Sequence, residues 1–220
     1  MGALDGRVAL ITGGARGQGR AHALALAAEG ADIVVADGPD PMTDLTYPLG
    51  TEDDLRETAK LVEELGQRCL PIPLDVRDSA AVDAAIKQTV ADMGSLDIVV
   101  ANAGIVSTGP LEEVSDNVWQ QLIDTNLTGA FHTLRAAIPV MRQQQFGRIV
   151  VTSSMGGRMG IPNWPPTTSP SGVSSASPSP PPWRSPKTAS RSTSSARPQR
   201  RHPWCNHPAV MTSRTISCAG

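Results

Sequence analysis

The chain has 220 residues, of which 40% are hydrophobic and 18% charged, with a formal net charge of −2; this suits one domain, or one domain with a tail. No apolar stretch approaches the roughly 20 residues that span a bilayer, and the N-terminus lacks the pattern of a signal peptide. The three cysteines, Cys69, Cys205 and Cys218, have no metal or redox spacing, which argues against a disulfide framework or a metal site and favours the cytoplasm.

Short apolar runs alternate with amphipathic stretches along the first three quarters of the chain. We expect strands at residues 7–12, 31–36, 70–74, 96–101 and 148–152, because these runs are brief and rich in β-branched residues. We expect helices at 19–29, 51–65 and 79–93, with Ser79 as an N-cap. Residues 115–141 predict a long helix, either alone or after a short helix. This alternation predicts an α/β fold with a parallel sheet covered on both faces.

The composition changes near Ile161. Twelve of the 19 prolines lie from Pro162 onward, and no Asp or Glu follows Asp124. Residues 162–220 carry a net charge of +7, which leaves −9 for residues 1–161. Such a basic segment can bind nucleic acid, but its few apolar side chains favour disorder. We therefore predict a domain over 1–161, a disordered or aberrant Ser/Pro/Arg-rich tail over 162–220, and neither nucleic acid nor membrane as a partner.

Small and acidic residues gather where the predicted strands end. Ligands of open α/β sheets bind at the carboxyl ends of the strands. After the first strand the chain reads Thr-Gly-Gly-Ala-Arg-Gly-Gln-Gly, and glycines there let the backbone approach a pyrophosphate at a helix N-terminus. The candidate cofactor-binding residues of this loop are Gly13, Ala15, Arg16, Gly17, Gln18 and Gly19.

Asp37 ends the second strand, 18 residues after Gly19. A carboxylate at this place accepts hydrogen bonds from the ribose hydroxyls of NAD and repels the 2′-phosphate of NADP. Arg16 favours the opposite choice, since a basic side chain beside the glycines pairs with a phosphate. We give Asp37 the greater weight because no basic residue follows it directly, and we predict NAD as the cofactor.

These motifs together resemble the short-chain dehydrogenase/reductase family. The resemblance rests on the glycine loop and on four further motifs, which are Asp75 in Leu-Asp-Val, Asn102-Ala103-Gly104, Asn126 in Thr-Asn-Leu-Thr-Gly, and Ser154 in Thr-Ser-Ser-Met-Gly-Gly. Residues 37–55 are similar to an insertion of the carveol-dehydrogenase-like, mycofactocin-coupled members. The resemblance implies a Rossmann-type, doubly wound sheet in three α/β/α layers, NAD, a small alcohol or ketone substrate, and commonly a homotetramer.

The resemblance also implies a role for each motif. Asp75 would bind the adenine amino group with Val76 packed nearby, and Asn102, Ala103 and Gly104 would line the cofactor's ribose. Asn126 would kink its helix and hold a water in a proton relay. Ser154 would donate a hydrogen bond to the substrate oxygen.

The catalytic pair of the family is missing from this sequence. The family places a tyrosine about 13 residues after the serine as general acid/base, and a lysine four residues later that lowers its pKa. Thr167 and Ser171 stand at those positions, and the only tyrosine is Tyr47. An aliphatic hydroxyl is too weak an acid to replace tyrosine, so we expect impaired activity.

Two hypotheses explain the missing pair. One is a natural pseudo-enzyme with a disordered tail, for which the alternative function is a non-catalytic nucleotide-binding module whose proline-rich tail, for example at 180–183, binds a partner. The other is a shifted reading frame: a one-base shift of the possible codons permits His-Tyr-Val-Ala-Lys-Trp over 167–172, although its lysine falls one residue short of the family's spacing. In either case the last strands and helices of the family fold would be missing or scrambled, which would leave a sheet edge open to aggregation.

Overall fold

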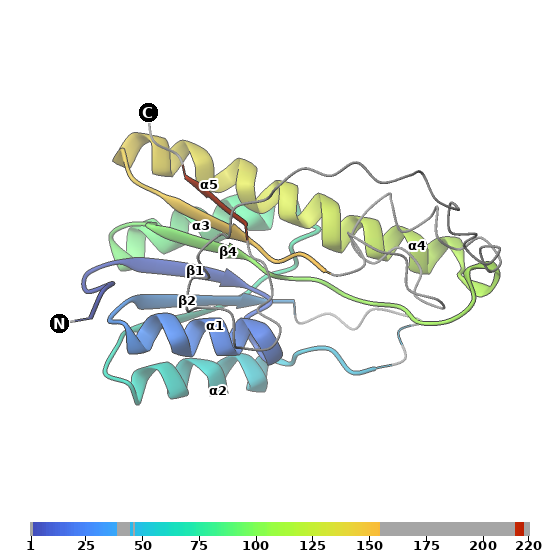
Figure 1. Ribbon diagram of the computed structural model, residues 1–220, viewed down its shortest axis with the longest axis horizontal. Helices are drawn as coiled ribbons and strands as arrows, with labels where there is room; N and C mark the ends of the chain where they lie inside the picture. The colour runs from blue at the N-terminus through green and yellow to red at the C-terminus, as the bar shows by residue number, and fades with distance from the viewer. Residues whose placement is uncertain (1, 39–44, 46, 155–213, 218–220) are drawn as a thin grey trace, which may run out of the picture. The chain divides into compact units, whose positions relative to one another are not determined.

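The computed structural model describes residues 2–38, 45, 47–154 and 214–217. Their centre is a six-stranded sheet in the order β3-β2-β1-β4-β5-β6 (Figure 1). Neighbours among the first five strands pair in parallel, whereas β6 is antiparallel to β5. The strands are β1 (Val8–Thr12), β2 (Asp32–Asp37), β3 (Cys69–Pro73), β4 (Ile98–Ala101), β5 (Arg148–Val151) and β6 (Arg214–Ser217).

Helices cover both faces of this sheet, which confirms the predicted three-layer α/β/α fold. In Figure 1, α1 and α2 lie on one face, and α3 and α5 lie on the other. The helical elements are α1 (Gly17–Ala28), α2 (Glu52–Glu63), α3 (Ser79–Met93), the 3₁₀ turn η1 (Leu111–Glu113), α4 (Asp116–Ile123), the π-helical segment η2 (Asp124–Gly129) and α5 (Ala130–Gln144).

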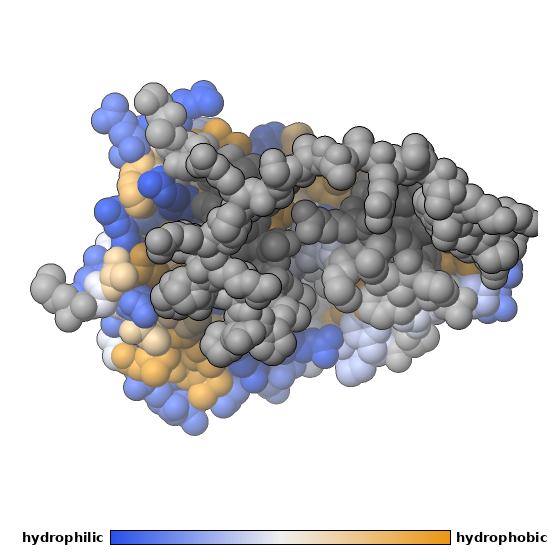
Figure 2. All heavy atoms as spheres, in the orientation of Figure 1, coloured by the Kyte–Doolittle hydropathy of each residue, from blue (hydrophilic) through white to orange (hydrophobic). Residues whose placement is uncertain are grey.

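Two hydrophobic cores lie between the layers because side chains alternate between the faces of a strand. In β1, Val8 and Leu10 pack toward α3 and α5, whereas Ala9 and Ile11 pack toward α1 and α2. The central strands are buried on both faces, as the continuous apolar runs predicted. Figure 2 shows an apolar outer surface over α1, which suits its alanine-rich sequence, and a mostly hydrophilic one over α2.

Three local features differ from the sequence-based expectations. The N-cap of α3 is Asp78 and not Ser79, because the carboxylate of Asp78 accepts hydrogen bonds from the N–H groups of Ala80 and Ala81. Within 115–141 the structure has a short helix, α4, before the long helix α5, but the π-helical segment η2 between them was not expected. The edge of β5, expected to be open, pairs with β6 over four residues.

The rest of the predicted tail lies outside the described residues, as does the predicted boundary at 161–162. Within the described ranges, no helix has both the length and the apolar character needed to cross a membrane.

Candidate functional site

The turn between β1 and α1 is held close to the end of β4. Gly13 has a φ of +68°, and a Cβ there would lie 2.8 Å from the Cα of Ala103. A Cβ on Gly19 would overlap the carbonyl oxygen of Gly13. Glycine is therefore required at both positions, and the compact turn brings the N-terminus of α1 to the carboxyl end of the sheet, where a helix attracts anions.

A polar cluster behind this turn fixes the carbonyl oxygen of Ala15. Arg20 donates to it from Nε and Nη2, at 3.1 and 2.6 Å, and Thr58 Oγ1 donates to it at 2.9 Å. The Nη2 group of Arg20 also donates to the carbonyl oxygen of Asp54 at 3.0 Å. Because Thr58 and Asp54 belong to α2, this helix supports the glycine turn from outside the cavity.

Asp37 lies at the carboxyl end of β2, beside the glycine turn. Its Oδ2 accepts a hydrogen bond from the N–H of Ala15, and its Oδ1 accepts one from the N–H of Gly38, both at 2.9 Å. Burial raises the pKa of Asp37 above its ordinary value, and the two N–H donors oppose part of this rise. A Cβ on Gly50 would lie 3.2 Å from Oδ2, so the insertion reaches the same carboxylate.

Asn102 joins the ends of three neighbouring strands. Its Nδ2 donates to the carbonyl oxygens of Thr12 and Gly13 at 3.1 and 3.2 Å, and its Oδ1 accepts from Thr152 Oγ1 at 3.1 Å. Thr12 Oγ1 accepts from the N–H groups of Asn102 and Ala103 at 3.0 and 3.1 Å. The cluster fixes the path of the backbone where β4 enters its loop.

Asp75 follows β3 and pairs with Arg77. The guanidinium of Arg77 donates to Oδ2 from Nε and Nη2, at 2.8 and 2.6 Å, and the N–H of Arg77 donates to Oδ1 at 2.9 Å. Burial raises the pKa of Asp75, but the hydrogen bonds and charge of Arg77 outweigh burial and lower that pKa below its ordinary value. Asp75 is thus ionised at neutral pH.

Asn126 lies inside the π-helical segment η2. Its Oδ1 accepts from the N–H of Ile105 at 2.8 Å, and its Nδ2 donates to the carbonyl oxygen of Ile105 at 2.9 Å. One amide side chain therefore pairs with both backbone polar groups of Ile105 in the loop after β4. Where the sequence predicts a kink at Asn126, the structure has a π-helical turn between α4 and α5.

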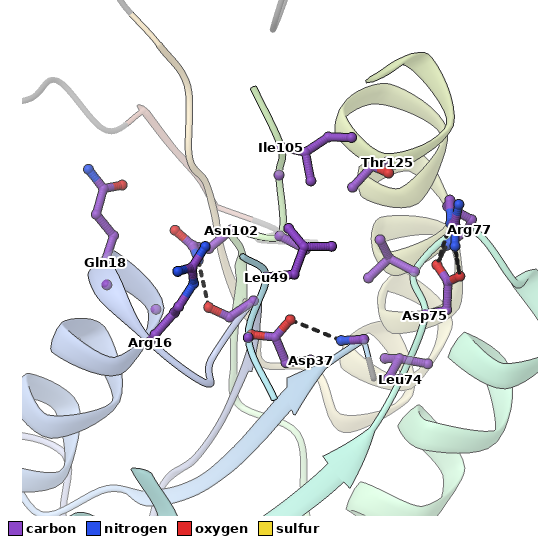
Figure 3. A pocket seen from close by; sticks show the side chains of 18 of the residues that line it. Arg16, Gln18, Asp37, Leu49, Leu74, Asp75, Arg77, Asn102, Ile105 and Thr125 are labelled. Carbon is purple, nitrogen blue, oxygen red and sulfur yellow. Dashed lines mark hydrogen bonds and ion pairs between the residues drawn. The ribbon is translucent and has the colours of Figure 1, made fainter. Parts of the chain in front are cut away.

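These strand ends and loops surround a cavity of about 440 Å³, shown in Figure 3. Of the residues predicted from sequence, those on its wall are Gly13, Arg16, Gly17, Gln18, Gly19, Asp37, Asp75, Val76, Asn102, Ala103 and Gly104. The wall does not include Ala15, Asn126 or Ser154. Ala15 and Asn126 instead make the hydrogen bonds that position wall residues.

The cavity wall also contains residues that the sequence did not single out, namely Gly38, Tyr47, Leu49, Gly50, Leu74, Arg77, Ile105 and Thr125. Tyr47, from the insertion, accepts a hydrogen bond at its hydroxyl from the N–H of Val106 at 2.8 Å. The guanidinium of Arg16 lies 5.9 Å from the centre of the Tyr47 ring. The one sequence signal for Tyr47 is that it is an isolated aromatic residue in a polar insertion. The sequence does not show that its side chain lies on the cavity wall.

Ser154 follows β5 and is half-buried. Thr167 and Ser171, where the family's tyrosine and lysine were expected, lie outside the described residues. Among the described side chains, no group of three or more His, Cys, Asp or Glu residues is arranged to hold a metal ion.

Comparison with known proteins identifies a family. The model of the short chain dehydrogenase family matches residues 7–174. A (-)-trans-carveol dehydrogenase of Rhodococcus erythropolis is 49% identical over 162 residues, which is 73% of this chain and 58% of the relative. An uncharacterized NAD-dependent oxidoreductase of Mycobacterium tuberculosis is 47% identical over 163 residues, 73% of this chain and 59% of the relative.

Solved structures that resemble this chain belong to the same kind of enzyme as these relatives. Carveol dehydrogenase from Mycobacterium avium in complex with NAD has a TM-score of 0.72 and 44% identity, covering 80% of this chain and 62% of that one. A short chain dehydrogenase from Mycobacterium paratuberculosis bound to NAD has a TM-score of 0.73 and 36% identity, covering 80% and 64%. The chain therefore spans less than two thirds of the length of these proteins.

Proposed function

The chain belongs to the short-chain dehydrogenase family, and from that premise we propose that it binds NAD and serves hydride transfer between this cofactor and a secondary alcohol or ketone. One observation carries the proposal: the carboxylate of Asp37 lies beside the glycine turn on the wall of a single cavity. A glycine turn for the pyrophosphate and an acid for the ribose is the donor and acceptor set that a dinucleotide requires.

The residues present fit this cofactor. The close packing of Gly13 on Ala103 and of Gly19 on Gly13 shapes the turn at the start of α1, where a pyrophosphate would meet the helix N-terminus. Asp37 would accept from the adenosine ribose hydroxyls, and Asp75 with Val76 would meet the adenine. Asn102, Ala103 and Gly104 would contact the second ribose. When bound, NAD supplies the acceptor for hydride, and this chain's residues orient it and exclude water.

The reaction also needs groups that handle the substrate oxygen and its proton. We assign the hydrogen bond that polarises the oxygen to Ser154, and the support of a proton relay to Asn126. The bonds between Asn126 and Ile105 keep that side chain in one orientation. A secondary alcohol is the substrate class that these roles suit, and carveol is the first compound to test because the relatives in Rhodococcus and M. avium are named for it.

The expected general acid/base is the weak point of this chain, because Thr167 and Ser171 stand where the family has tyrosine and lysine. We therefore propose that turnover by the chain as written is impaired. A non-catalytic nucleotide-binding module is the second candidate function, and the absence of the tyrosine and lysine from positions 167 and 171 favours it. Assays with secondary alcohols separate the two, since a pure binding module takes up NAD without reducing it.

Calorimetric titration with NAD and NADP tests the cofactor proposal. Wild type is expected to bind NAD more tightly than NADP. Asp37→Asn is expected to weaken NAD about 10- to 100-fold, because it removes charged hydrogen-bond acceptors for the ribose. Asp83→Asn, an exposed site on α3, is the matched control and should leave both affinities unchanged. Equal affinity of the wild type for NAD and NADP, or no binding of either, would contradict the proposal.

A further inference from the structure

Thr125 carries a buried hydroxyl that is unpaired within the described part of the chain. The residue is 4% exposed, and its Oγ1 has no hydrogen-bond partner among the residues that the structure describes. It also lies on the wall of the cavity. A buried polar group left unsatisfied costs stability, so a hydroxyl in this place calls for a physical reason.

The other buried helical threonines of the described part behave differently. Thr58, Thr89 and Thr133 each donate to the carbonyl oxygen four residues earlier, at 3.1, 2.8 and 2.9 Å. This is the usual way in which a helix satisfies a threonine. Thr125 lies in the π-helical segment η2, where backbone bonds run from i to i+5. The bond to the carbonyl oxygen of Gln121, four residues earlier, is not made.

The position of η2 shows which part of the cavity Thr125 faces. Gly129, one turn later on the same buried side, packs so closely on Val76 that a Cβ at Gly129 would lie 2.5 Å from its Cγ2. Val76 follows β3, which neighbours the strand that ends in Asp37. In Figure 3, Thr125 is drawn beside Ile105 on the Asp75–Arg77 side of the pocket and away from Gln18.

We infer that the hydroxyl of Thr125 makes a hydrogen bond to the adenosine half of the dinucleotide, an inference that rests on the proposed function. The cavity side bounded by Asp37 and Val76 is the one that the proposal gives to the adenosine. The π-helical turn frees the hydroxyl from its helix, and the bound nucleotide supplies the missing partner. Thr125 is then a binding residue that recognises the adenosine half through a hydrogen bond in addition to shape.

Isothermal titration of the full chain with NAD, ADP-ribose and nicotinamide mononucleotide tests the inference. Thr125→Val keeps the shape and removes the hydroxyl, and is expected to weaken both NAD and ADP-ribose about five- to tenfold. It should leave nicotinamide mononucleotide unchanged. Thr125→Ser, which keeps the hydroxyl, should remain within about twofold of wild type. Thr89→Val is the matched control, since it removes a buried helical hydroxyl outside the cavity.

Thermal melting of the ligand-free protein gives a second readout, in which Thr125→Val is expected to stabilise the fold although it weakens nucleotide binding. Removing an unsatisfied hydroxyl should raise the melting temperature of Thr125→Val by about 2–4 °C, while Thr89→Val, which loses a made hydrogen bond, should melt lower. NAD should then stabilise Thr125→Val less than it stabilises wild type.

The outcomes separate the two levels of the proposal. If wild type binds neither NAD nor ADP-ribose, the proposed function fails and the inference fails with it. If wild type binds both and Thr125→Val binds them equally well, the inference alone is wrong. A lower melting point of ligand-free Thr125→Val, or a loss of affinity confined to nicotinamide mononucleotide, would also overturn it.

Discussion

Asp97 lies at the opposite end of the strands from the cavity, just before β4, and is 4% exposed. Its carboxylate accepts from Ser95 Oγ at 2.7 Å, from Arg7 Nη1 at 2.9 Å and from the N–H of Val8 at 3.0 Å. Burial raises the pKa of Asp97, but these donors and the charge of Arg7 together lower it below its ordinary value. The ionised carboxylate thus joins the starts of β1 and β4.

Asp97→Asn is expected to lower the free energy of unfolding at pH 7 by about 1–3 kcal/mol, since it removes acceptors from buried donors. Because the folded-state pKa is lowered, the contribution of Asp97 is present above the ordinary value of 3.8 and is lost as the pH falls through the folded-state pKa. The difference between variant and wild type should therefore shrink in acid. Urea unfolding at several pH values measures it. Exposed Asp92→Asn serves as control, and a difference that grows in acid would refute the assignment.

Cys69, at the start of β3, carries a thiol that packs against apolar side chains. Burial raises the pKa of Cys69 to about 12, so its thiol is protonated at neutral pH. A thiol in that state is a poor nucleophile and metal ligand, and Cys69 acts as an apolar side chain beneath α1 and α2.

At the scale of elements, the insertion after β2 is attached to the rest of the site through Tyr47. Its hydroxyl accepts from the N–H of Val106 at 2.8 Å, its ring faces the guanidinium of Arg16, and Gly50 approaches Asp37. The insertion therefore forms a wall of the cavity together with the loops after β1 and β4.

Tyr47→Phe keeps the ring and leaves the Val106 N–H without its acceptor. We expect NAD to dissociate about three- to tenfold faster, because one hydrogen bond that holds this wall is lost. Tyr47→Ala, which also removes the ring, should dissociate faster still. Stopped-flow displacement of NADH fluorescence measures both rates. Wild-type rates in the alanine variant would show that this wall does not retain the cofactor.

Helices and strands could be predicted from the sequence where the local hydrophobic pattern matches the packing in the folded protein. Five strands and the helices α1, α2 and α3 follow from apolar runs, helical periodicity and glycine stops. The N-cap of α3 could not be predicted, because Asp78 and Ser79 are both favourable N-cap residues and only the backbone geometry determines which of them caps the helix. The family resemblance predicted a kink at Asn126 but not the π-helical form of the segment. The effect of this segment on Thr125 depends on hydrogen bonds that no local sequence pattern reveals.

At the scale of the whole molecule, the chain joins residues that form an α/β sheet with a cavity at its carboxyl edge to a segment of different composition. The glycine turn, Asp37, Asp75 and Asn102 were predictable as one site because parallel strands end at one edge of the sheet. The catalytic half was not, since position 167 holds threonine where the family pattern requires tyrosine. The strand β6 was also unexpected, because the composition of the tail predicts no regular structure there.

Turnover of secondary alcohols by this chain is expected to be about 10²- to 10⁴-fold below that of a relative with the full catalytic pair, the range that general acid/base catalysis contributes. NADH absorbance in the presence of carveol measures it for both proteins. Activity equal to that of the relative would show that another group moves the proton. The nucleotide sequence around codons 160–220 distinguishes a shifted frame from a natural tail, and an intact frame encoding the same tail in related genomes would exclude the shift.

The hydrogen bonds of Arg20 connect the glycine turn to a helix that never meets the cavity. Arg20 and Thr58 bind the carbonyl oxygen of Ala15, and Arg20 also binds the start of α2. A ligand that requires the closed turn adds its binding free energy to every local opening that breaks these bonds. We therefore expect amide hydrogen exchange in the first turns of α2 to slow when a ligand occupies the cavity, although α2 lies outside the cavity wall.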